Sequence, residues 1–467
     1  MTDLLSQSAA QLRALFRTGA AGPVDLLEAT LERIAAVNPT INAIAYLDED
    51  RARAAAQAAA RRWSAGAPLS DMDGMAVTVK DSINCVGMPW RHGSAAHADL
   101  PDATVDSPPA ARLKEAGAVI VGKTTMPDFG MMAAGVSSLY GIVRNPWDPE
   151  RNTGGSSAGA GAALAAGIGV AAVGTDIAGS VRLPAGHCGV VALKPTQGRI
   201  PHLPASTMRS AGPMARTVSD AIDMYRVLSL PDARDAWSLA PESDDRMDRP
   251  LTPRGMRIGI LTDLGPGFAL HPRVEAVVRS AAAVLADGGA EVTDVPAPFD
   301  DDPYPALDRV FQVRGRAEWE GIAPDRRHLV IPAVADWAAG AAELSATDYA
   351  RDLAAVDVSQ ARFAAALAGF DMVVAPVIPT PGFAADEVGL DPSRPLAHCG
   401  YTAWFNQTAQ PASSLCFGFV DGCPVGIQIA GRRCADQEVL RLTRWLEERR
   451  PFPMPTPPVT LAAGGTR

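Results

Sequence analysis

Residues 154–199 read GGSSAGAGAALAAGIGVAAVGTDIAGSVRLPAGHCGVVALKPTQGR, and this stretch decides how the rest of the chain is interpreted. It contains the paired serines Ser156 and Ser157 and a third serine, Ser180, in a turn rich in glycine and alanine. Small residues let a substrate carbonyl approach the main chain closely, and backbone N–H groups there can stabilise negative charge on its oxygen. The stretch therefore indicates backbone N–H groups placed beside a hydroxyl nucleophile.

Composition and charge are those of a globular chain with ample material for a core. Of its 467 residues, 47% are hydrophobic and 20% are charged, and the formal net charge is −10. This length allows one large domain or two to three ordinary domains. No basic block and no interleaving of basic and aromatic residues is present, so we expect no nucleic-acid partner.

The cysteines and the N-terminus indicate a cytoplasmic protein. The six cysteines form no C-x-x-C pair and have no metal-like spacing to a histidine, so we expect reduced, mostly buried thiols. The N-terminal segment resembles an amphipathic helix without the basic start and apolar run of a secretory signal. Residues 156–175 are uncharged, but Ala, Gly and Ser dominate them and Gly167 and Gly169 interrupt them, so we predict no membrane span.

Apolar periodicity predicts helices that alternate with short, uncharged strands. Two or three helices are expected over 2–66, and further helices over 108–117, 155–168, 219–230 (with a serine N-cap), 271–287 and 436–449. Strands are expected over 75–80, 118–124, 170–176, 190–196, 257–263, 291–298, 371–378 and 424–431. This alternation predicts an α/β core in which helices cover both faces of a sheet.

Four regions follow from this pattern. We expect an N-terminal helical region, 1–70, packed on a core domain, 71–450. Within that domain, 300–370 is expected to be a variable, mainly helical region on the substrate side. The proline-rich tail, 451–467, is predicted to be loose.

Each serine has a structural alternative to a catalytic role. Ser180 follows a predicted buried strand, where the turn 177–180 can direct several N–H groups into one concavity, but it can equally be the N-cap of a helix. Ser157 is the central serine of a formal G-x-S-x-G match. That motif requires a preceding strand, and RNPWDPERNTG contains two prolines, so we interpret the match as accidental and one of the paired serines as a helix N-cap.

Lysine is rare in this chain, which has only four: Lys80, Lys114, Lys123 and Lys194. Lys80 ends the predicted strand MAVTVK, and burial there would favour the neutral amine. The alternative is a solvated strand end paired with Asp81. For Lys194 we expect a structural ion pair. The seven histidines show no zinc spacing, and no nucleotide-binding motif is present, so we expect no metal and no cofactor.

Several motifs together resemble the amidase signature family. They are GGSSAGAGAALAAG and GTDIAGSVRLPAGHCGVVALKPTQGR, with 24 residues from Ser156 to Ser180, and AVTVKD around Lys80. YGIVRNPWDPER, FNQTAQPASS and PVGIQIAGRR extend the resemblance to nearly the whole chain, with the weakest match from 230 to 370. The resemblance implies a single α/β/α domain around a large, twisted mixed sheet.

The resemblance also implies a role for each matched residue. Ser180 is implied as the nucleophile, Ser156 as a bridging serine in a cis peptide and Lys80 as the base. The backbone N–H groups of Ile177, Ala178, Gly179 and Ser180 are implied as the oxyanion hole. Two departures are Ala178, where the family usually has glycine and where a positive φ would be strained, and AGAG after Ser157, where the family often has GGS.

The expected function is hydrolysis of a linear carboxylic amide to an acid and ammonia or an amine, through an acyl-enzyme. Anilide or related C–N specificity, as in aryl acylamidases, is one alternative. An amidotransferase A-type subunit is another, although Leu183 stands where those subunits typically carry glutamine. A non-catalytic homologue is the third. Met131 and Met132 are candidate apolar walls or ordinary core residues, and Thr153 and Gly154 are further candidates for substrate binding. The substrate and the oligomeric state stay open, with a homodimer among the alternatives.

Overall fold

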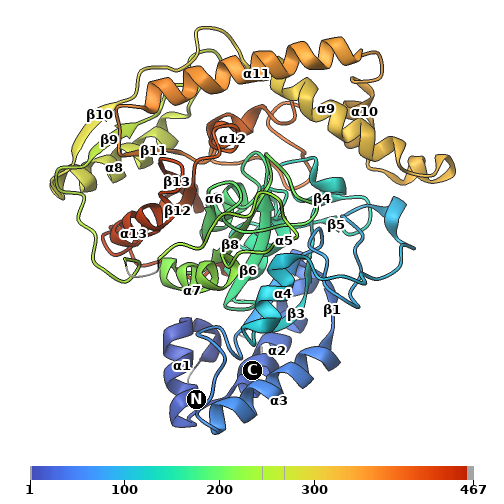
Figure 1. Cartoon of the computed structure of the whole chain (residues 1–467), viewed down its shortest axis with the longest axis vertical. Coiled ribbons are helices and arrows are strands. Elements are labelled where there is room, and N and C mark those ends of the chain that lie inside the picture. Colours follow the sequence, from blue (N-terminus) through green and yellow to red (C-terminus); the bar gives the residue numbers. More distant parts are fainter. Residues whose placement is uncertain (1–2, 244–245, 268, 460–467) are drawn as a thin grey trace.

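The fold is built on a central sheet of eleven strands in a computed structural model that describes residues 3–243, 246–267 and 269–459 (Figure 1). The strands are β1 Ile44–Leu47, β2 Ala76–Lys80, β3 Val119–Thr124, β6 Ala171–Asp176, β7 Val191–Lys194, β8 Ser210–Ala215, β9 Arg257–Ile260, β10 Glu291–Asp294, β11 Met372–Pro376, β12 Ala412–Val420 and β13 Cys423–Gly431. A separate two-stranded sheet pairs β4 Val136–Ser137 with β5 Gly141–Ile142.

The α-helices account for most of the remaining regular structure. They are α1 Ala9–Thr18, α2 Pro23–Ile41, α3 Glu49–Ser64, α4 Pro108–Glu115, α5 Ala158–Ala165, α6 Arg182–Cys188, α7 Val218–Leu228, α8 Pro272–Asp287, α9 Tyr304–Glu320, α10 Pro332–Ala339, α11 Ala346–Leu367, α12 Gly400–Gln407 and α13 Asp436–Glu447. Short 3-10 helices cover Leu4–Ser6, Ala95–His97, Asp128–Gly130, Pro324–Leu329 and Ala397–Cys399.

The sheet is mixed, as expected. Its order is β1-β3-β2-β6-β8-β7-β12-β13-β11-β9-β10. Strands β3, β2 and β6 are parallel neighbours, and so are β11, β9 and β10, whereas all other neighbouring pairs are antiparallel. Because β2 and β6 run parallel side by side, their carboxyl ends lie at the same edge of the sheet.

Helices cover both faces of the sheet, which confirms the predicted α/β architecture. In β11, Met372 and Val374 belong to one hydrophobic cluster, and Val373 and Ala375 belong to a second. Successive strand residues point to opposite faces, so the two clusters lie on opposite sides. Helices α7, α8 and α13 contribute to the first cluster, and α6, α9, α10, α11 and α12 contribute to the second.

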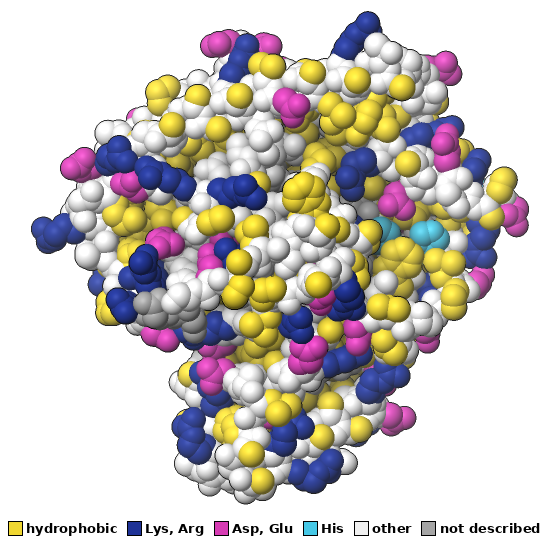
Figure 2. Space-filling model, viewed as in Figure 1, with side chains coloured by type: hydrophobic (Ala, Val, Ile, Leu, Met, Phe, Trp, Pro, Cys, Tyr) yellow, Lys and Arg dark blue, Asp and Glu magenta, His cyan; other side chains and the backbone are white. Residues whose placement is uncertain are grey.

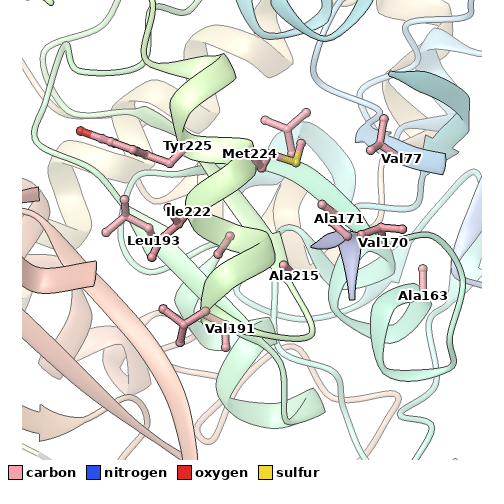
Figure 3. Packing of buried hydrophobic residues seen from close by; sticks show 14 of the residues in the cluster. Val77, Ala163, Val170, Ala171, Val191, Leu193, Ala215, Ile222, Met224 and Tyr225 are labelled. Atoms are coloured by element: carbon pink, nitrogen blue, oxygen red, sulfur yellow. The ribbon is translucent and has the colours of Figure 1, made fainter. Parts of the chain in front are cut away.

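The first cluster shows how the helices are held on the strands. Ile222, Met224 and Tyr225 of α7 belong to the same cluster as Val191 and Leu193 of β7 (Figure 3). All five side chains are buried, so the contact between helix and strand excludes water. Burying one large apolar side chain contributes about 1.5–3 kcal/mol, so this interface fixes the helix firmly on the sheet.

Three strands of the central sheet were not predicted from the sequence, β1, β8 and β12, and neither were the two short strands β4 and β5. Strand β8 reads SAGPMA and lies between β6 and β7, where Pro213 pairs with Val173. A proline normally argues against an interior strand, so the sequence pattern did not predict β8. Strand β1 has only four residues, and β12 carries a register shift between Cys416 and Gly418.

Two predicted helix starts differ in the structure. The helix expected from 219 begins at Val218, and its N-cap is Thr217, whose side chain accepts from Asp220 N, rather than a serine. Helix α5 begins at Ala158, and Ser157, at its N-cap position, makes no capping hydrogen bond. The Ser157 hydroxyl instead donates to Thr175 O at 3.3 Å, because the chain has turned toward β6.

The N-terminal helices α1, α2 and α3 lie at one end of the molecule, and α9, α10 and α11 lie at the other (Figure 1). The N-terminal helices add residues such as Leu12 and Leu26 to the first cluster. In the tail, Phe452 packs edge-on against Phe419, and residues 460–467 lie outside the described residues. All six cysteines are free thiols, and five of them are buried.

Charged side chains of both signs are interspersed on the face shown in Figure 2. Within the described ranges, none of the helices combines the length and apolar character that a membrane crossing requires.

Candidate active site

Lys80 lies at the carboxyl end of β2 and is fully buried. Its Nζ lies 2.8 Å from Ser156 Oγ and 3.1 Å from Thr175 Oγ1. Thr175 belongs to β6, the parallel neighbour of β2, so the sheet itself places these two side chains together. The solvated strand end that we considered for Lys80 is therefore ruled out.

Burial lowers the pKa of Lys80 to about 7. An ammonium ion loses its hydration inside the protein, so the neutral amine is favoured there. The carboxylate of Asp176 opposes this effect, and the guanidinium of Arg209 reinforces it. The structure thus contains an amine that is partly neutral near pH 7, which is the form that can accept a proton.

Ser156 stands between Lys80 and the turn that carries Ser180. The peptide bond between Gly155 and Ser156 is cis. A Cβ on Gly155 would overlap the backbone of Ala134, so only glycine fits beside this bond. The neighbouring Ser157 N–H donates to Ser180 O at 3.1 Å, which ties the paired serines to the Ser180 turn.

Asp176 organises the turn that joins β6 to α6. Its carboxylate accepts from Gly179 N at 2.8 Å and from Val181 N at 3.2 Å. From the other side, Thr402 Oγ1 donates to Ala178 O at 2.5 Å. These bonds fix the backbone of residues 177–181 before any ligand binds, which is what an anion-stabilising turn requires.

Two expectations about this turn are corrected by the structure. The N–H of Gly179 is already bonded to Asp176, so the oxyanion candidates reduce to Ile177, Ala178 and Ser180, whose N–H groups have no partner among the described residues. The positive φ falls on Gly179, at 126°, and Ala178 is not among the residues with positive φ. The alanine is therefore accommodated without the strain that we anticipated.

A fully buried ion pair supports the Asp176 carboxylate. Arg182 binds it through Nε at 3.1 Å and Nη2 at 3.0 Å. Arg182 also donates to Asn406 Oδ1, Gln428 Oε1 and Thr402 O. Burial alone would raise the pKa of Asp176, but the positive charge of Arg182 outweighs it and the pKa falls to about 2. Asp176 therefore stays ionised and continues to accept the hydrogen bonds from Gly179 N and Val181 N.

Lys80, Ser156 and Ser180 line one cavity, together with Ile177 and Ala178 of the turn. Ser180 lines this space, whose volume is about 720 Å³ including the open mouth, and its hydroxyl has no hydrogen-bond partner among the described residues. Met131 and Met132 line the same cavity, and Met132 belongs to the second cluster while Met131 packs against it. Their role in substrate binding stays a prediction.

Thr153 and Gly154 do not line this cavity in the described structure. Both are buried, and Gly154 N donates to Asn152 Oδ1 at 2.8 Å. A Cβ on Gly154 would crowd the ring of His187, so the close approach at this glycine is to protein rather than to an open space.

Lys194 also departs from expectation, because it has no ion pair within the described ranges. Its Nζ donates to Pro195 O at 2.6 Å, and burial followed by the charge of Arg182 lowers its pKa. Among the described residues, no group of three His, Cys, Asp or Glu side chains is placed to hold a metal ion.

Sequence reasoning missed Asp176 and Arg182, although a signal was present. They are the only Asp, Glu, Lys or Arg residues between Arg151 and Lys194. Opposite charges isolated in a buried segment must pair, so their partnership could have been inferred. Arg209 and Arg314, which also line the cavity, lie in distant segments and gave no signal.

Comparison with known proteins agrees with this geometry. The sequence profile described as Amidase matches residues 25–440, which include every residue of the site. This chain belongs to the amidase signature family.

Three known proteins illustrate what this chain is similar to. The A-type subunit of glutamyl-tRNA(Gln) amidotransferase from Chloroflexus aurantiacus is 34% identical, with 96% of this chain and 99% of the relative covered. A bacterial aryl acylamidase structure aligns with a TM-score of 0.89 and 26% identity, over 99% of both chains. The 6-aminohexanoate cyclic dimer hydrolase in complex with its substrate aligns with a TM-score of 0.87 and 27% identity, over 98% of this chain and 100% of that one.

Proposed function

We propose that this amidase signature protein hydrolyses a linear carboxylic amide to an acid and ammonia or an amine, through an acyl-enzyme on Ser180. The observation that carries this proposal is the 2.8 Å contact between Lys80 Nζ and Ser156 Oγ at the wall of the cavity that Ser180 also lines. A serine hydroxyl is a weak nucleophile until a neighbouring group takes its proton. Lys80 is the group with the proton affinity to do so.

The proton passes through Ser156. A neutral amine has two N–H donors and one lone pair, so Lys80 can donate to Thr175 and accept from Ser156. The Ser156 hydroxyl gives its proton to Lys80 as it takes the proton of Ser180. Ser180 Oγ then bonds to the amide carbon, and the carbonyl oxygen becomes an oxyanion held by the N–H groups of Ile177, Ala178 and Ser180.

The same route returns the proton. As the C–N bond breaks, the ammonium of Lys80 protonates the leaving nitrogen through Ser156, which regenerates the neutral amine. A water molecule attacks the acyl-enzyme, passes one proton along the relay and releases the acid with Ser180 restored. The scheme calls on no cofactor, and its relay begins and ends with the same protonation states.

The wall of the cavity supports a substrate with an apolar part. Met131, Met132, Phe129 and Trp337 line it beside the polar relay. An anilide is therefore an alternative substrate within the same reaction, and the similarity to a bacterial aryl acylamidase favours testing it.

A second candidate function is that of an A-type amidotransferase subunit, which the curated relatives at 34% identity favour. Such a protein would release ammonia for a partner enzyme. Leu183 stands where those subunits typically carry glutamine, and here it is fully buried in the second cluster. We favour the independent amidase, which acts without a nucleic-acid or protein partner.

The test uses the purified full chain without ATP, RNA or a partner. A panel of aliphatic amides, anilides and glutamine is assayed for ammonia or amine release, and a fluorophosphonate probe is used to label the nucleophile. We expect turnover of at least one amide and labelling at Ser180. Both should be lost in Ser180→Ala but kept in Ser359→Ala, which changes a partly exposed residue of α11.

The other outcomes separate the alternatives. Glutamine turnover that appears only in the presence of tRNA and partner subunits would favour the amidotransferase function. Absence of labelling would favour a non-catalytic homologue and would overturn the proposed hydrolysis.

A further inference from the structure

Two arginines from distant segments line the cavity that holds Ser180: Arg209, which precedes β8, and Arg314 of α9. The Nε atoms of both are buried and have no hydrogen-bond partner. Arg209 Nη2 donates one hydrogen bond to Pro204 O, at 3.1 Å. No acceptor for the side chain of Arg314 is present among the described residues. The cavity thus contains guanidinium donors without acceptors.

Another arginine of α9, Arg316, is paired within the described ranges, where Arg314 is not. Two residues beyond Arg314, the guanidinium of Arg316 donates to Glu320 at 2.7 Å and lies over the ring of Trp319. A buried donor without an acceptor costs about 1–3 kcal/mol, and more when it is charged. The buried Nε–H groups of Arg209 and Arg314 carry this free-energy cost, and a ligand that supplies acceptors would remove it.

With Lys80 in the neutral form that the proposed relay requires, the charges that line this cavity sum to about one positive charge. Arg209 and Arg314 contribute two, and Glu318, one turn further along α9, contributes one negative charge. Burial holds the pKa of His92 well below its usual value, so this lining residue is neutral. Burial and the nearby charge of Arg314 lower the pKa of Arg209 to about 10, which leaves it charged at neutral pH and shows that the two guanidinium groups repel each other.

We propose that Arg209 and Arg314 form an anion subsite that binds a carboxylate carried by the amide substrate, away from the bond that is cleaved. A carboxylate supplies two acceptor oxygens in the plane that a guanidinium fork matches. Its single negative charge also balances the surplus of the cavity, which a doubly charged phosphate would exceed. This inference rests on the proposed amidase function, because it names the class of amide that the same site accepts.

Binding is measured without turnover, by protection of Ser180 from the fluorophosphonate probe. Glutarate, with a second carboxylate, is compared with pentanoate, which has the same number of carbons and only one. We expect glutarate to protect at about 10- to 100-fold lower concentration, the range that one charged hydrogen-bonded contact provides. Equal protection by the two acids would overturn the subsite.

Variants assign the effect to the arginines. Arg314→Gln should remove most of the advantage of glutarate, whereas Arg316→Gln, whose guanidinium is paired on the outside of the helix, should keep it. Glu318→Gln should increase the advantage, because it removes a repelling charge without touching either arginine. An unchanged advantage in both Arg314→Gln and Glu318→Gln would overturn the assignment.

Turnover then shows which half of the substrate carries the carboxylate. Glutaramate, with the charge on the acyl side, is compared with pentanamide, and N-acetyl-4-aminobutanoate, with the charge on the amine side, is compared with N-butylacetamide. For the charged amide that is accepted, we expect Arg314→Gln to raise KM about 10- to 100-fold, and to raise KM for its neutral counterpart much less.

Failure of this inference is distinguishable from failure of the proposed function. If Ser180 is labelled and neutral amides are hydrolysed as well as charged ones, the subsite is wrong and the amidase function stands. If Ser180 is not labelled at all, the amidase function fails and the subsite fails with it.

Discussion

Lys80 Nζ lies 2.8 Å from Ser156 Oγ although the two residues are 76 positions apart in the chain. Lys80 is fully buried and Ser156 is nearly so, which shields this contact from bulk solvent. A contact of this kind serves as a proton path only while the amine can be neutral, and this condition leads to the first two predictions.

Replacing Lys80 by arginine should abolish most activity although it preserves the positive charge. Arginine stays protonated in proteins and cannot accept the proton of Ser156. We expect kcat to fall by about 10²- to 10⁴-fold, the range for loss of a general base. The control is Lys114→Arg, because Lys114 forms a surface ion pair with Asp106 at 2.7 Å and should tolerate the change. Near-normal kcat in Lys80→Arg would contradict the base assignment.

Activity should rise with pH through about 7, the pKa of Lys80. The base works in its unprotonated form, which is about one tenth of the amine at pH 6 and about nine tenths at pH 8. A profile of kcat/KM against pH for a neutral amide measures this directly. A maximum near pH 5 would mean that a different group takes the proton.

Arg209→Gln should move the same profile to higher pH. The charge of Arg209 lowers the pKa of Lys80, so removing it makes the ammonium easier to form. The neutral amide is used again, so that loss of carboxylate binding does not affect the result. Arg316→Gln should leave the midpoint where it is. A shift of the Arg209→Gln midpoint to lower pH would refute the electrostatic link.

Gly179→Ala should inactivate the enzyme and lower its stability. The φ of Gly179 is 126°, and a Cβ there would overlap Thr402 Oγ1, which anchors the turn. Gly255→Ala is a matched control with a φ of 76° and no atom near the added Cβ, so it carries backbone strain without a clash. Strain alone costs about 1–2 kcal/mol, and urea unfolding should show a clearly larger loss for Gly179→Ala. Equal losses would show that the clash is relieved by relaxation.

The ion pair between Asp176 and Arg182 should be essential, unlike the ion pairs on the surface. Arg182→Met leaves a buried carboxylate without its cation, and we expect a loss of about 3–5 kcal/mol in the free energy of unfolding. Arg273→Met breaks an equally well-formed bidentate pair with Asp421, but both side chains there are 54% exposed. We expect less than about 1 kcal/mol at that site. A loss of similar size in both variants would remove the distinction that burial makes.

The sequence predicted most strands of the core, because runs such as AVTVK and VVAPV are uncharged and bounded by turn residues. It did not predict β8, because Gly212 and Pro213 are residues typical of loops. In that strand, pairing with β6 and β7 on both sides outweighs the local preference of these residues. The site shows the same division. The short motifs that carry Lys80, Ser156 and Ser180 were recognised, whereas partners from distant segments, such as Arg209 and Arg314, were not.

The sequence by itself determined the class of fold, the family resemblance and the three hydroxyl and amine groups of the proposed relay, because these depend on short patterns of residue type. Only the tertiary structure decided that Lys80 is buried, that Gly179 N–H is taken by Asp176 and that Arg209 and Arg314 share the cavity. Burial, hydrogen-bond partners and the sum of nearby charges are properties of groups brought together from distant positions, and these properties set the pKa values and the ligand preference of the site.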